Sequence, residues 1–574
     1  MATPLPVAPL DADSRRQFLW FMLIALVLLG AGMGLRDPWP SDEPRFALVA
    51  RQMVESGQWL FPHRGSELYS DKPPLMFWLQ AASFELTRNW RIAFLLPSLL
   101  AGLLTLGLTW DLGRRLWNPR VGLHAAAALL MTFQFAFQFK RAQIDPVVVA
   151  WITLANWGLL LHFLRGPDWR AFWLGCFAAG LGVITKGVGI IAFLMFVPYL
   201  AARWGGWSGV ARTRQSALHW LAGLGFFLLP ILAWLVPMLL VARLDASPEH
   251  AAYVNDLLFR QTARRYANSW NHVQPVWYYL PIVLFSWIPL SLAYPGLLPR
   301  WWRAVRARDP RVVLPLAWVA LVIVFFTIPP GKRDVYILPA LPMLALAAAP
   351  WLEELAATRW LRITAFAVAV TLGLTLVAAS LLAVSGGGRL AASAQRALEG
   401  AGPHGLTVLL LIGLAFLVGA ALFRVRRGVH GLLAGFAGMW MAWSLVACPL
   451  LNDERSAAGI MQRAGEVIGP EAELGLVGWK EQNLLMADRP ARDFGFKRPW
   501  ADQFAAAVQW QAGAPASRWL FAQAPAVGAC VERTRAVDLG RANRRDWLLF
   551  RADAVVPGCT PQVEDGGDAD DAGE

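Results

Sequence analysis

The chain has 574 residues, of which 57% are hydrophobic and 16% are charged, and its mean hydropathy is +0.44. Soluble domains have roughly 45–50% apolar and about 25% charged residues, so this composition excludes a soluble globular protein and predicts one that crosses a membrane many times. The formal net charge of +13 does not indicate a nucleic-acid partner, because the basic residues stand in short loops between apolar runs and not along one soluble face.

Apolar runs of about 17–25 residues are long enough to cross the hydrocarbon core as helices. About thirteen such runs occur, near residues 18–35, 91–113, 121–139, 143–164, 170–185, 188–202, 217–242, 276–299, 312–328, 335–351, 360–384, 405–423 and 430–450. Many of the 30 tryptophans stand at the ends of these runs, where an amphipathic ring fits the headgroup layer. We therefore expect an all-α polytopic membrane protein over residues 1–451.

The distribution of basic residues predicts the orientation. Every second loop is short and rich in arginine, which is typical of cytoplasmic loops. The amino terminus is then cytoplasmic, and the opposite loops are 36–90, 140–143, 243–275, 329–334, 385–404 and everything after about residue 451. The first run has no small-residue cleavage pattern before Asp37, so we expect it to remain as the first helix.

The first exported loop, residues 36–90, is too patterned to be a passive connector. Residues 43–56 have the apolar spacing of an amphipathic helix at the membrane surface. Asp42 stands directly before this helix and could cap it, or it could act chemically together with Glu43. Asp71 and Lys72 precede two prolines and a second apolar stretch, which predicts another helix start.

The segment after residue 452 has a mixed composition and predicts a small extracytoplasmic α/β domain over residues 452–559. Short β-like runs at 474–479, 518–523 and 546–556 alternate with helical stretches near 456–468 and 500–512. Cys530 and Cys559 both lie in this exported segment, where a disulfide is permitted, although the sequence alone does not establish one. Residues 560–574 are acidic and free of aromatic residues, so we expect a disordered tail.

Five segments carry a family resemblance. They are DEPRFALVARQM, LYSDKPPLMFWL, KRAQIDPVVVAW, VITKGVGI and FFTIPPGKRDVYILPALPMLAL. In order and spacing these resemble the motifs of bacterial polyprenyl-phosphate-sugar-dependent glycosyltransferases, such as the 4-amino-4-deoxy-L-arabinose lipid A transferases. The wider superfamily includes the dolichyl-phosphate-mannose protein mannosyltransferases. The chain has Asp71 where these relatives usually carry Glu, and Arg333-Asp334 where they carry a more neutral dipeptide, changes that bear on the substrate more than on the reaction.

The resemblance implies a GT-C type fold in the bacterial inner membrane, with the active site on the extracytoplasmic side. It also implies transfer of a sugar from a polyprenyl-phosphate donor to a lipid, such as a lipid A-like molecule, or to another glycan or protein acceptor. A multi-helix transporter or flippase of lipid-linked substrates is the alternative. The helices have almost no acidic residue at their centres and no internal repeat, which argues against a carrier.

Breaking the bond between a sugar and a phosphate oxygen places growing negative charge at the membrane surface, and cations are needed to meet it. The predicted phosphate-binding residues are Lys72, Arg141, Lys186, Lys332 and Arg333. Lys140 fits better as an anchor for lipid headgroups, and snorkelling is the alternative interpretation for the whole set.

An attacking group also needs a carboxylate, and Asp42 is the first candidate, with Glu43 second. A single displacement would invert the anomeric centre. Asp145 could pair with Arg141 at i,i+4, contact the sugar or cap its helix. We expect Asp71, Asp145 and Tyr336 to position the substrate.

No cofactor is indicated. The eight histidines are dispersed without zinc-type spacing, and no glycine-rich nucleotide-binding loop occurs. The exported loop 243–275 could close over the donor as a lid, or lie on the surface as a connector.

Overall fold

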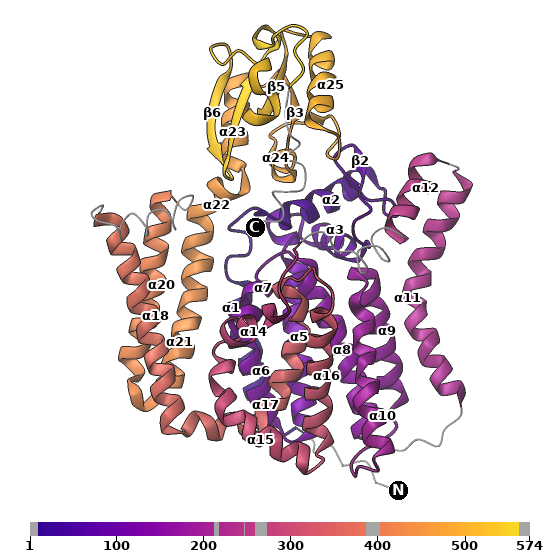
Figure 1. The fold of residues 1–574 in the computed structure, drawn as a ribbon, viewed down its shortest axis with the longest axis vertical. Helices are drawn as coiled ribbons and strands as arrows, with labels where there is room; N and C mark the ends of the chain where they lie inside the picture. The colour runs from indigo at the N-terminus through magenta and orange to yellow at the C-terminus, as the bar shows by residue number, and fades with distance from the viewer. Residues whose placement is uncertain (1–9, 212–216, 246, 259–271, 386–401, 562–574) are drawn as a thin grey trace.

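The computed structural model describes residues 10–211, 217–245, 247–258, 272–385 and 402–561 (Figure 1). A tall bundle of helices forms one end of the molecule, and a smaller unit from the carboxy-terminal part of the chain stands on the other end, above α2 (Glu43–Ser56) and α3 (Leu75–Thr87). The predicted acidic tail lies almost wholly outside the described residues, as do residues 259–271 of the predicted lid.

Each of the apolar segments predicted from the sequence is helical. The helices of the bundle are α1 (Ala12–Gly30), α4 (Trp90–Ala93), α5 (Leu96–Leu116), α6 (Pro119–Met131), α7 (Phe133–Phe139), α8 (Ile144–Leu164), α9 (Trp169–Lys186), η1 (Val188–Met195), α10 (Phe196–Trp204), α11 (Ala217–Leu244), η3 (Val276–Tyr278), α14 (Tyr279–Pro281), η4 (Ile282–Ser286), η5 (Leu290–Ala293), α15 (Tyr294–Arg306), α16 (Pro310–Thr327), η6 (Asp334–Ile337), α17 (Ala340–Ala357), α18 (Arg359–Ser385), α20 (Gly402–Phe423), η7 (Val425–Arg427), α21 (Gly428–Ala442), η8 (Trp443–Ala447) and α22 (Cys448–Ser456).

Among the described residues, eight helical spans are long and apolar enough to cross a membrane, or up to ten if each of two bent pairs forms one span. The bent pairs are α6 with α7 and residues 276–286 with 290–306. The protein is therefore a multi-span membrane protein, and the figure of thirteen spans stays a prediction. Helix α1 carries Asp13, Arg15 and Arg16 in its first turns, which shortens its uncharged length.

Residues 36–90, called loop one from here on, lie folded against the top of the bundle (Figure 1). Helix α2 begins and ends close to the predicted limits, but it is not a free surface helix, because it buries Phe46, Val49 and Met53 against the bundle. The loop continues through a two-stranded hairpin, β1 (His63–Arg64) with β2 (Glu67–Leu68), before α3 begins directly after the two prolines.

The carboxy-terminal unit is built on a five-stranded sheet with the order β4-β3-β5-β7-β6. Its strands are β3 (Glu473–Val477), β4 (Ala491–Asp493), β5 (Arg518–Gln523), β6 (Val537–Ala542) and β7 (Arg545–Phe550). β3 pairs in parallel with β4 and β5, whereas β7 is antiparallel to both β5 and β6. Its main helices are α23 (Ala458–Ile468), α24 (Glu481–Met486) and α25 (Trp500–Ala512), with α26 (Ala524–Val527), η9 (Gly528–Cys530) and η10 (Ala552–Ala554) as short turns.

Alternate residues of the central strands face opposite sides of this sheet, as the two-residue period of a strand requires. Phe521 packs into a cluster with Ile460 and Met461 of α23, while Leu520 packs with Phe504 of α25. The first of these clusters also contains Ala47 and Leu48 of α2, so the hydrophobic core of the carboxy-terminal unit continues into loop one.

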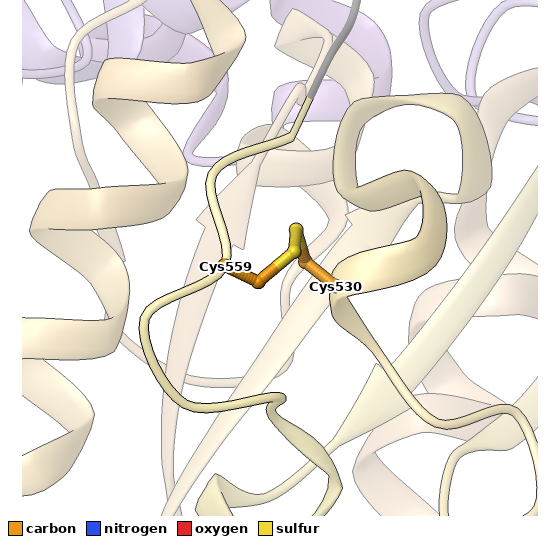
Figure 2. The surroundings of a disulfide bond; sticks show 2 residues. All are labelled: Cys530 and Cys559. Carbon is orange, nitrogen blue, oxygen red and sulfur yellow. A yellow bond between two sulfur atoms is a disulfide. The ribbon is translucent and has the colours of Figure 1, made fainter.

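A disulfide joins Cys530 to Cys559 and ties the last described segment to the unit (Figure 2). An exported segment permits this disulfide, but the sequence alone does not establish that it forms. The other two cysteines, Cys176 and Cys448, are buried and free.

Loop one and the carboxy-terminal unit also share polar contacts. The Ser66 hydroxyl donates to Asp493, and the backbone amide of Lys497 donates to Glu67. Both segments therefore lie at the same end of the bundle, while α10 and α15 reach the other end (Figure 1).

This arrangement predicts the outcome of labelling from the two sides of the membrane. In a background without Cys176 and Cys448, which are buried, single cysteines at Ser66 and Ala516 should react with an impermeant maleimide added from the same side. A cysteine at the exposed Ala307, after α15, should react only from the other side. Reaction of Ser66→Cys and Ala516→Cys from opposite sides would contradict the arrangement.

Candidate active site

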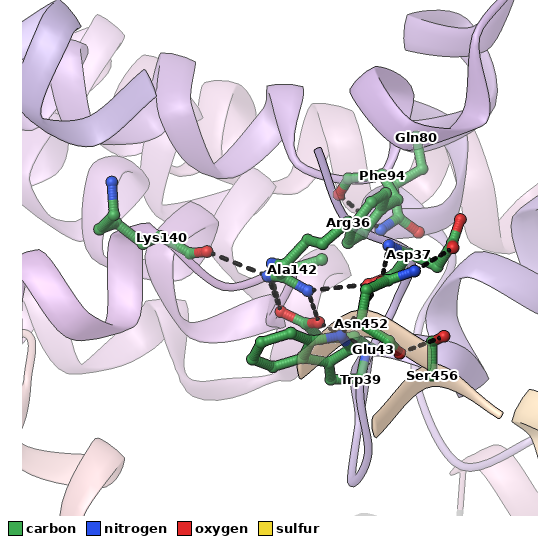
Figure 3. Close-up of polar contacts among 10 residues, drawn as sticks. All are labelled: Arg36, Asp37, Trp39, Glu43, Gln80, Phe94, Lys140, Ala142, Asn452 and Ser456. Atoms are coloured by element: carbon green, nitrogen blue, oxygen red, sulfur yellow. Dashed lines mark hydrogen bonds and ion pairs between the residues drawn. The ribbon is translucent and has the colours of Figure 1, made fainter. Parts of the chain in front are cut away.

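Glu43 anchors loop one to the bundle. Its carboxylate is 1% exposed and accepts hydrogen bonds from Arg36 at 2.5 and 2.8 Å, from the backbone amide of Trp39 at 2.9 Å and from that of Ala142 at 2.9 Å (Figure 3). Burial opposes the charge of Glu43, but the Arg36 guanidinium outweighs it and holds the pKa of this carboxyl below its ordinary value. Protein donors occupy both oxygens of Glu43. The carboxylate therefore links the start of loop one, which carries Arg36 and Trp39, to the segment before α8, which carries Ala142.

A second network joins loop one to the start of the carboxy-terminal unit. The Asn452 side chain donates to Asp37 at 2.8 Å and accepts from the Asp37 backbone amide at 2.7 Å (Figure 3). Arg91, which precedes α5, closes the network by donating to both carboxylate oxygens of Asp37 at 2.7 and 2.9 Å.

Asp42 is arranged quite differently from its neighbour. It occupies the N-cap position of α2, yet its side chain makes no capping hydrogen bond, so the capping interpretation is wrong. The backbone of Asp42 is already helical, which turns the carboxylate away from the free amides of the first turn. The carboxylate instead faces Arg333 at 3.5 Å, Arg45 at 3.8 Å and the Gln143 amide at 3.4 Å.

Cations from four segments act electrostatically on this carboxylate. Burial alone would raise the pKa of Asp42, but the neighbouring positive charges outweigh it and hold the pKa below its ordinary value of 3.8. In decreasing order of effect these cations are Arg333, Arg45, Lys72 and Arg141. Asp42 is therefore an ionised carboxylate at neutral pH and a weak base.

A second carboxylate acts on Arg333. Asp145, in the first turn of α8, pairs with Lys186 at the end of α9 at 2.5 Å, and the charge of Asp145 also acts on Arg333. The Lys186 ammonium also lies 5.0 Å from the centre of the Tyr336 ring. The predicted pair of Asp145 with Arg141 is wrong, because α8 begins at Ile144 and Arg141 lies before the helix, where i,i+4 geometry does not hold. Asp145 does not cap α8 either.

Two of the basic residues considered in the sequence, Lys332 and Lys140, donate hydrogen bonds to backbone carbonyls of the protein itself. Lys332 is 3% exposed and donates to the backbone carbonyls of Gln274 at 3.0 Å and Pro330 at 3.4 Å, so it holds the turn that presents Arg333. Lys140 donates to the carbonyls of Leu28 and Ala31 at the end of α1, and so it caps that helix and is not a headgroup anchor.

The carboxy-terminal unit reaches the site through charged contacts. Asp71 lies 3.9 Å from the Lys497 ammonium, and burial, which opposes its charge, is outweighed by this and other cations, so the pKa of Asp71 is lowered. Glu481, at the first position of α24, is buried and accepts from Arg45 at 2.8 Å and from Arg64 at 3.4 Å. One guanidinium thus touches both Asp42 of loop one and a carboxylate of the carboxy-terminal unit.

Sequence reasoning missed three residues of this cluster. Arg45 and Gln143 stand inside the quoted motifs, and Arg45 is three residues from Asp42, a spacing that places both on one face of a helix. Glu481 carries no comparable signal, because only the docking of α24 onto α2 brings it to Arg45. The described residues contain no group of three or more His, Cys, Asp or Glu side chains that could hold a metal ion.

Known proteins are similar to this chain in sequence and in fold. Residues 71–236 match the family model described as dolichyl-phosphate-mannose-protein mannosyltransferase. The chain is 30% identical over 365 residues to the undecaprenyl phosphate-α-4-amino-4-deoxy-L-arabinose arabinosyl transferase 1 of Pseudomonas fluorescens, covering 62% of this chain and 63% of that protein. It is 27% identical over 358 residues to the corresponding transferase of Yersinia pestis, covering 60% of each. The chain thus spans about three fifths of the length of the curated relatives it matches.

The fold is that of ArnT. The crystal structure of ArnT from Cupriavidus metallidurans bound to undecaprenyl phosphate superposes with a TM-score of 0.72 at 22% identity, covering 95% of this chain and 100% of that one. The apo structure of the same protein agrees equally well. These comparisons confirm the resemblance that the five sequence motifs indicated.

The Glu481 contact predicts a large effect on docking. Glu481→Gln leaves the buried Arg64 and the largely buried Arg45 without their carboxylate, and removing one partner of a buried pair costs about 3–5 kcal/mol. The variant should show a lower Tm and faster proteolysis between residues 452 and 480. Arg51→Ala is the matched control: it loses one hydrogen bond to the Leu485 carbonyl of α24, worth about 1 kcal/mol, and an exposed i,i+4 ion pair with Glu55, worth about 0.3–0.5 kcal/mol. Equal effects of the two substitutions would contradict the buried pair.

The contact of Glu481 with Arg45 and Arg64 also predicts that the folded protein loses stability at acidic pH. Burial opposes the charge of Glu481, but Arg45 and Arg64 outweigh it, so the folded pKa lies below the ordinary value of 4.5. The stabilisation is therefore complete above that value and is lost as the pH falls through the folded pKa. Thermal unfolding followed from pH 7 to pH 3 should show this loss in the wild type and a flatter dependence in Glu481→Gln.

Proposed function

We propose that this chain, which shares the fold of ArnT and is similar in sequence to aminoarabinose transferases, is an integral membrane glycosyltransferase. It moves a sugar from a polyprenyl-phosphate donor to a lipid acceptor by a single inverting displacement. The observation that supports this most directly is the Asp42 carboxylate, which makes no capping bond and faces Arg333 at 3.5 Å and Arg45 at 3.8 Å. Incubation of the purified protein with a polyprenyl-phosphate sugar and a lipid acceptor tests it by the release of polyprenyl phosphate.

The donor phosphate binds among the cations of the cluster. Lys72, Lys186 and Arg333 come from three segments, and Asp145 pairs with Lys186 while its charge also acts on Arg333. Such an array meets the negative charge that grows on the leaving phosphate oxygen. Lys332 supports the donor site indirectly, because its ammonium holds the turn before Arg333. Arg141 also acts on Asp42 through its charge.

Asp42 acts on the sugar as a charge. A carboxylate with a lowered pKa is a poor general base, but it stabilises an oxocarbenium-like transition state and orients the incoming group. Tyr336 and Asp145 stand next to Lys186 and position the sugar, while Asp71 orients the segment that carries Lys72. Glu43, whose oxygens are occupied, supports Asp42 from the neighbouring position. The reaction uses no cofactor.

The positive-inside pattern supports an extracytoplasmic active site in the bacterial inner membrane. Residues 452–559 then form an exported α/β domain, and their disulfide agrees with an oxidising compartment. A lipid acceptor is favoured because the site lies at the ends of membrane helices, where a lipid headgroup can reach it without leaving the bilayer.

Asp42→Asn should reduce kcat by about 10²–10⁴ while the protein still folds, since a positioned catalytic charge is worth that much. Glu43→Gln gives the contrast: it breaks the buried pair with Arg36 and should lower the yield of folded protein, at a cost of about 3–5 kcal/mol. Turnover per folded molecule, measured with a defined donor, separates the two roles. Near-normal turnover of Asp42→Asn would falsify the assignment.

Lys72→Ala should lower kcat/KM by about 2–4 kcal/mol of transition-state stabilisation, because a donor to a developing oxyanion is worth that much. Lys72→Arg should recover only part of the loss, since a planar guanidinium does not replace a compact ammonium. Lys497→Ala, at a half-exposed cation beside Asp71, is the control and should change kcat/KM little. If Lys72→Ala behaves like Lys497→Ala, Lys72 is not a phosphate ligand.

A further inference from the structure

The two bent pairs of helical segments in the bundle meet at their bends. The pair α6 with α7 is bent by 70°, and residues 276–286 with 290–306 are bent by 93°. Between the two bends, the backbone amide of Phe133 donates to the carbonyl of Ile288 at 2.8 Å. A break in a membrane helix frees backbone groups that need a partner away from water, and here one break supplies a partner to the other.

Gln134 lies at this contact, and it is 2% exposed. Its Oε1 accepts from the indole N–H of Trp287 at 2.6 Å, and its Nε2 donates to the backbone carbonyl of Asp334 at 3.0 Å and to the Asp334 carboxylate at 3.4 Å. An indole can only donate, so the buried Trp287 fixes which end of the amide faces it and leaves the NH₂ group for Asp334. The amide thus links both bent pairs to a residue 200 positions further along the chain.

The segment that Gln134 reaches carries Arg333. Asp334 begins the 3₁₀ turn η6, and Arg333 directly precedes it. On the other side, Lys332 is held by the hydrogen bonds from its ammonium to two backbone carbonyls. Arg333 therefore lies between two anchored residues, while its own side chain is 31% exposed and faces Asp42.

Tyr336 belongs to the same turn. Its backbone amide donates to the carbonyl of Arg333 at 3.1 Å, and residues three apart in a 3₁₀ turn lie on the same side. A hydrogen bond that fixes Asp334, which stands between them in sequence, therefore restrains both Arg333 and Tyr336.

We propose that Gln134 is a positioning residue of the transferase, which holds the turn so that the Arg333 guanidinium meets the donor phosphate. The inference rests on the proposed transferase function. Gln134 acts through Asp334 and not on the reacting atoms. The role requires an amide, because one side chain must accept from Trp287 and donate to Asp334 at the same time. An ionised carboxylate only accepts, and an apolar side chain does neither.

Gln134→Met keeps the length of the side chain and removes both hydrogen bonds. The kcat/KM for a polyprenyl-phosphate sugar, measured per folded molecule, should fall roughly tenfold, the effect of losing one buried hydrogen bond at the turn. Gln138→Met is the matched control, since Gln138 lies one turn later in α7, is also 2% exposed, and has an Oε1 without a partner among the described residues. The control should change kcat/KM little.

A double-mutant cycle with Arg333 separates positioning from a merely structural role. If Gln134 acts through Arg333, Gln134→Met should lower kcat/KM beside an intact Arg333 and have little further effect in Arg333→Ala, while its cost in Tm is the same in both backgrounds. A structural role would lower Tm in both backgrounds and leave kcat/KM unchanged. That result, or a full tenfold loss that persists in Arg333→Ala, would overturn the proposal.

Two further measurements do not depend on turnover. Hydrogen–deuterium exchange of the amides in residues 329–337 should be faster in Gln134→Met than in the wild type or in Gln138→Met. The Kd of a fluorescent polyprenyl phosphate should rise roughly tenfold in Gln134→Met, but only beside an intact Arg333. If the wild type follows this pattern and transfers no sugar, the transferase function fails while the positioning of a phosphate-binding Arg333 stands. An unchanged exchange rate or an unchanged Kd overturns the positioning role, even if the wild type transfers sugar.

Discussion

The buried ion pair of Arg36 with Glu43 is the interaction on which the rest of the site depends. Two charges with almost no exposure are stable only when every oxygen and N–H has a partner, and here the backbone amides of Trp39 and Ala142 and the carbonyls of Asp37 and Lys140 supply them. The pair thereby fixes the start of α2 against the turn before α8. The neighbouring Asp42 is left with its carboxylate free of the helix and directed at the cations.

The carboxy-terminal unit belongs to the same charge network and is not an appendage. Its core continues into α2, and Glu481 fixes one side of the Arg45 guanidinium while another nitrogen of that group faces Asp42. Arg45 therefore lies 2.8 Å from Glu481 and 3.8 Å from Asp42. A carboxy-terminal unit that docks in this way couples its own folding to the geometry of the site.

The sequence alone determined the membrane class, the helical segments, the helix after Asp42 and the main strands of the last unit, because hydrophobic period and local spacing carry that information. Only the tertiary structure decided which polar residues are partners. Asp42 and Glu43 have different partners, and Asp145 pairs with Lys186. Lys332 and Lys140 donate to backbone carbonyls, and Glu481 pairs with Arg45. These pairings join residues up to 436 positions apart, and a long-range contact is set by the packing of whole helices, which no local pattern encodes.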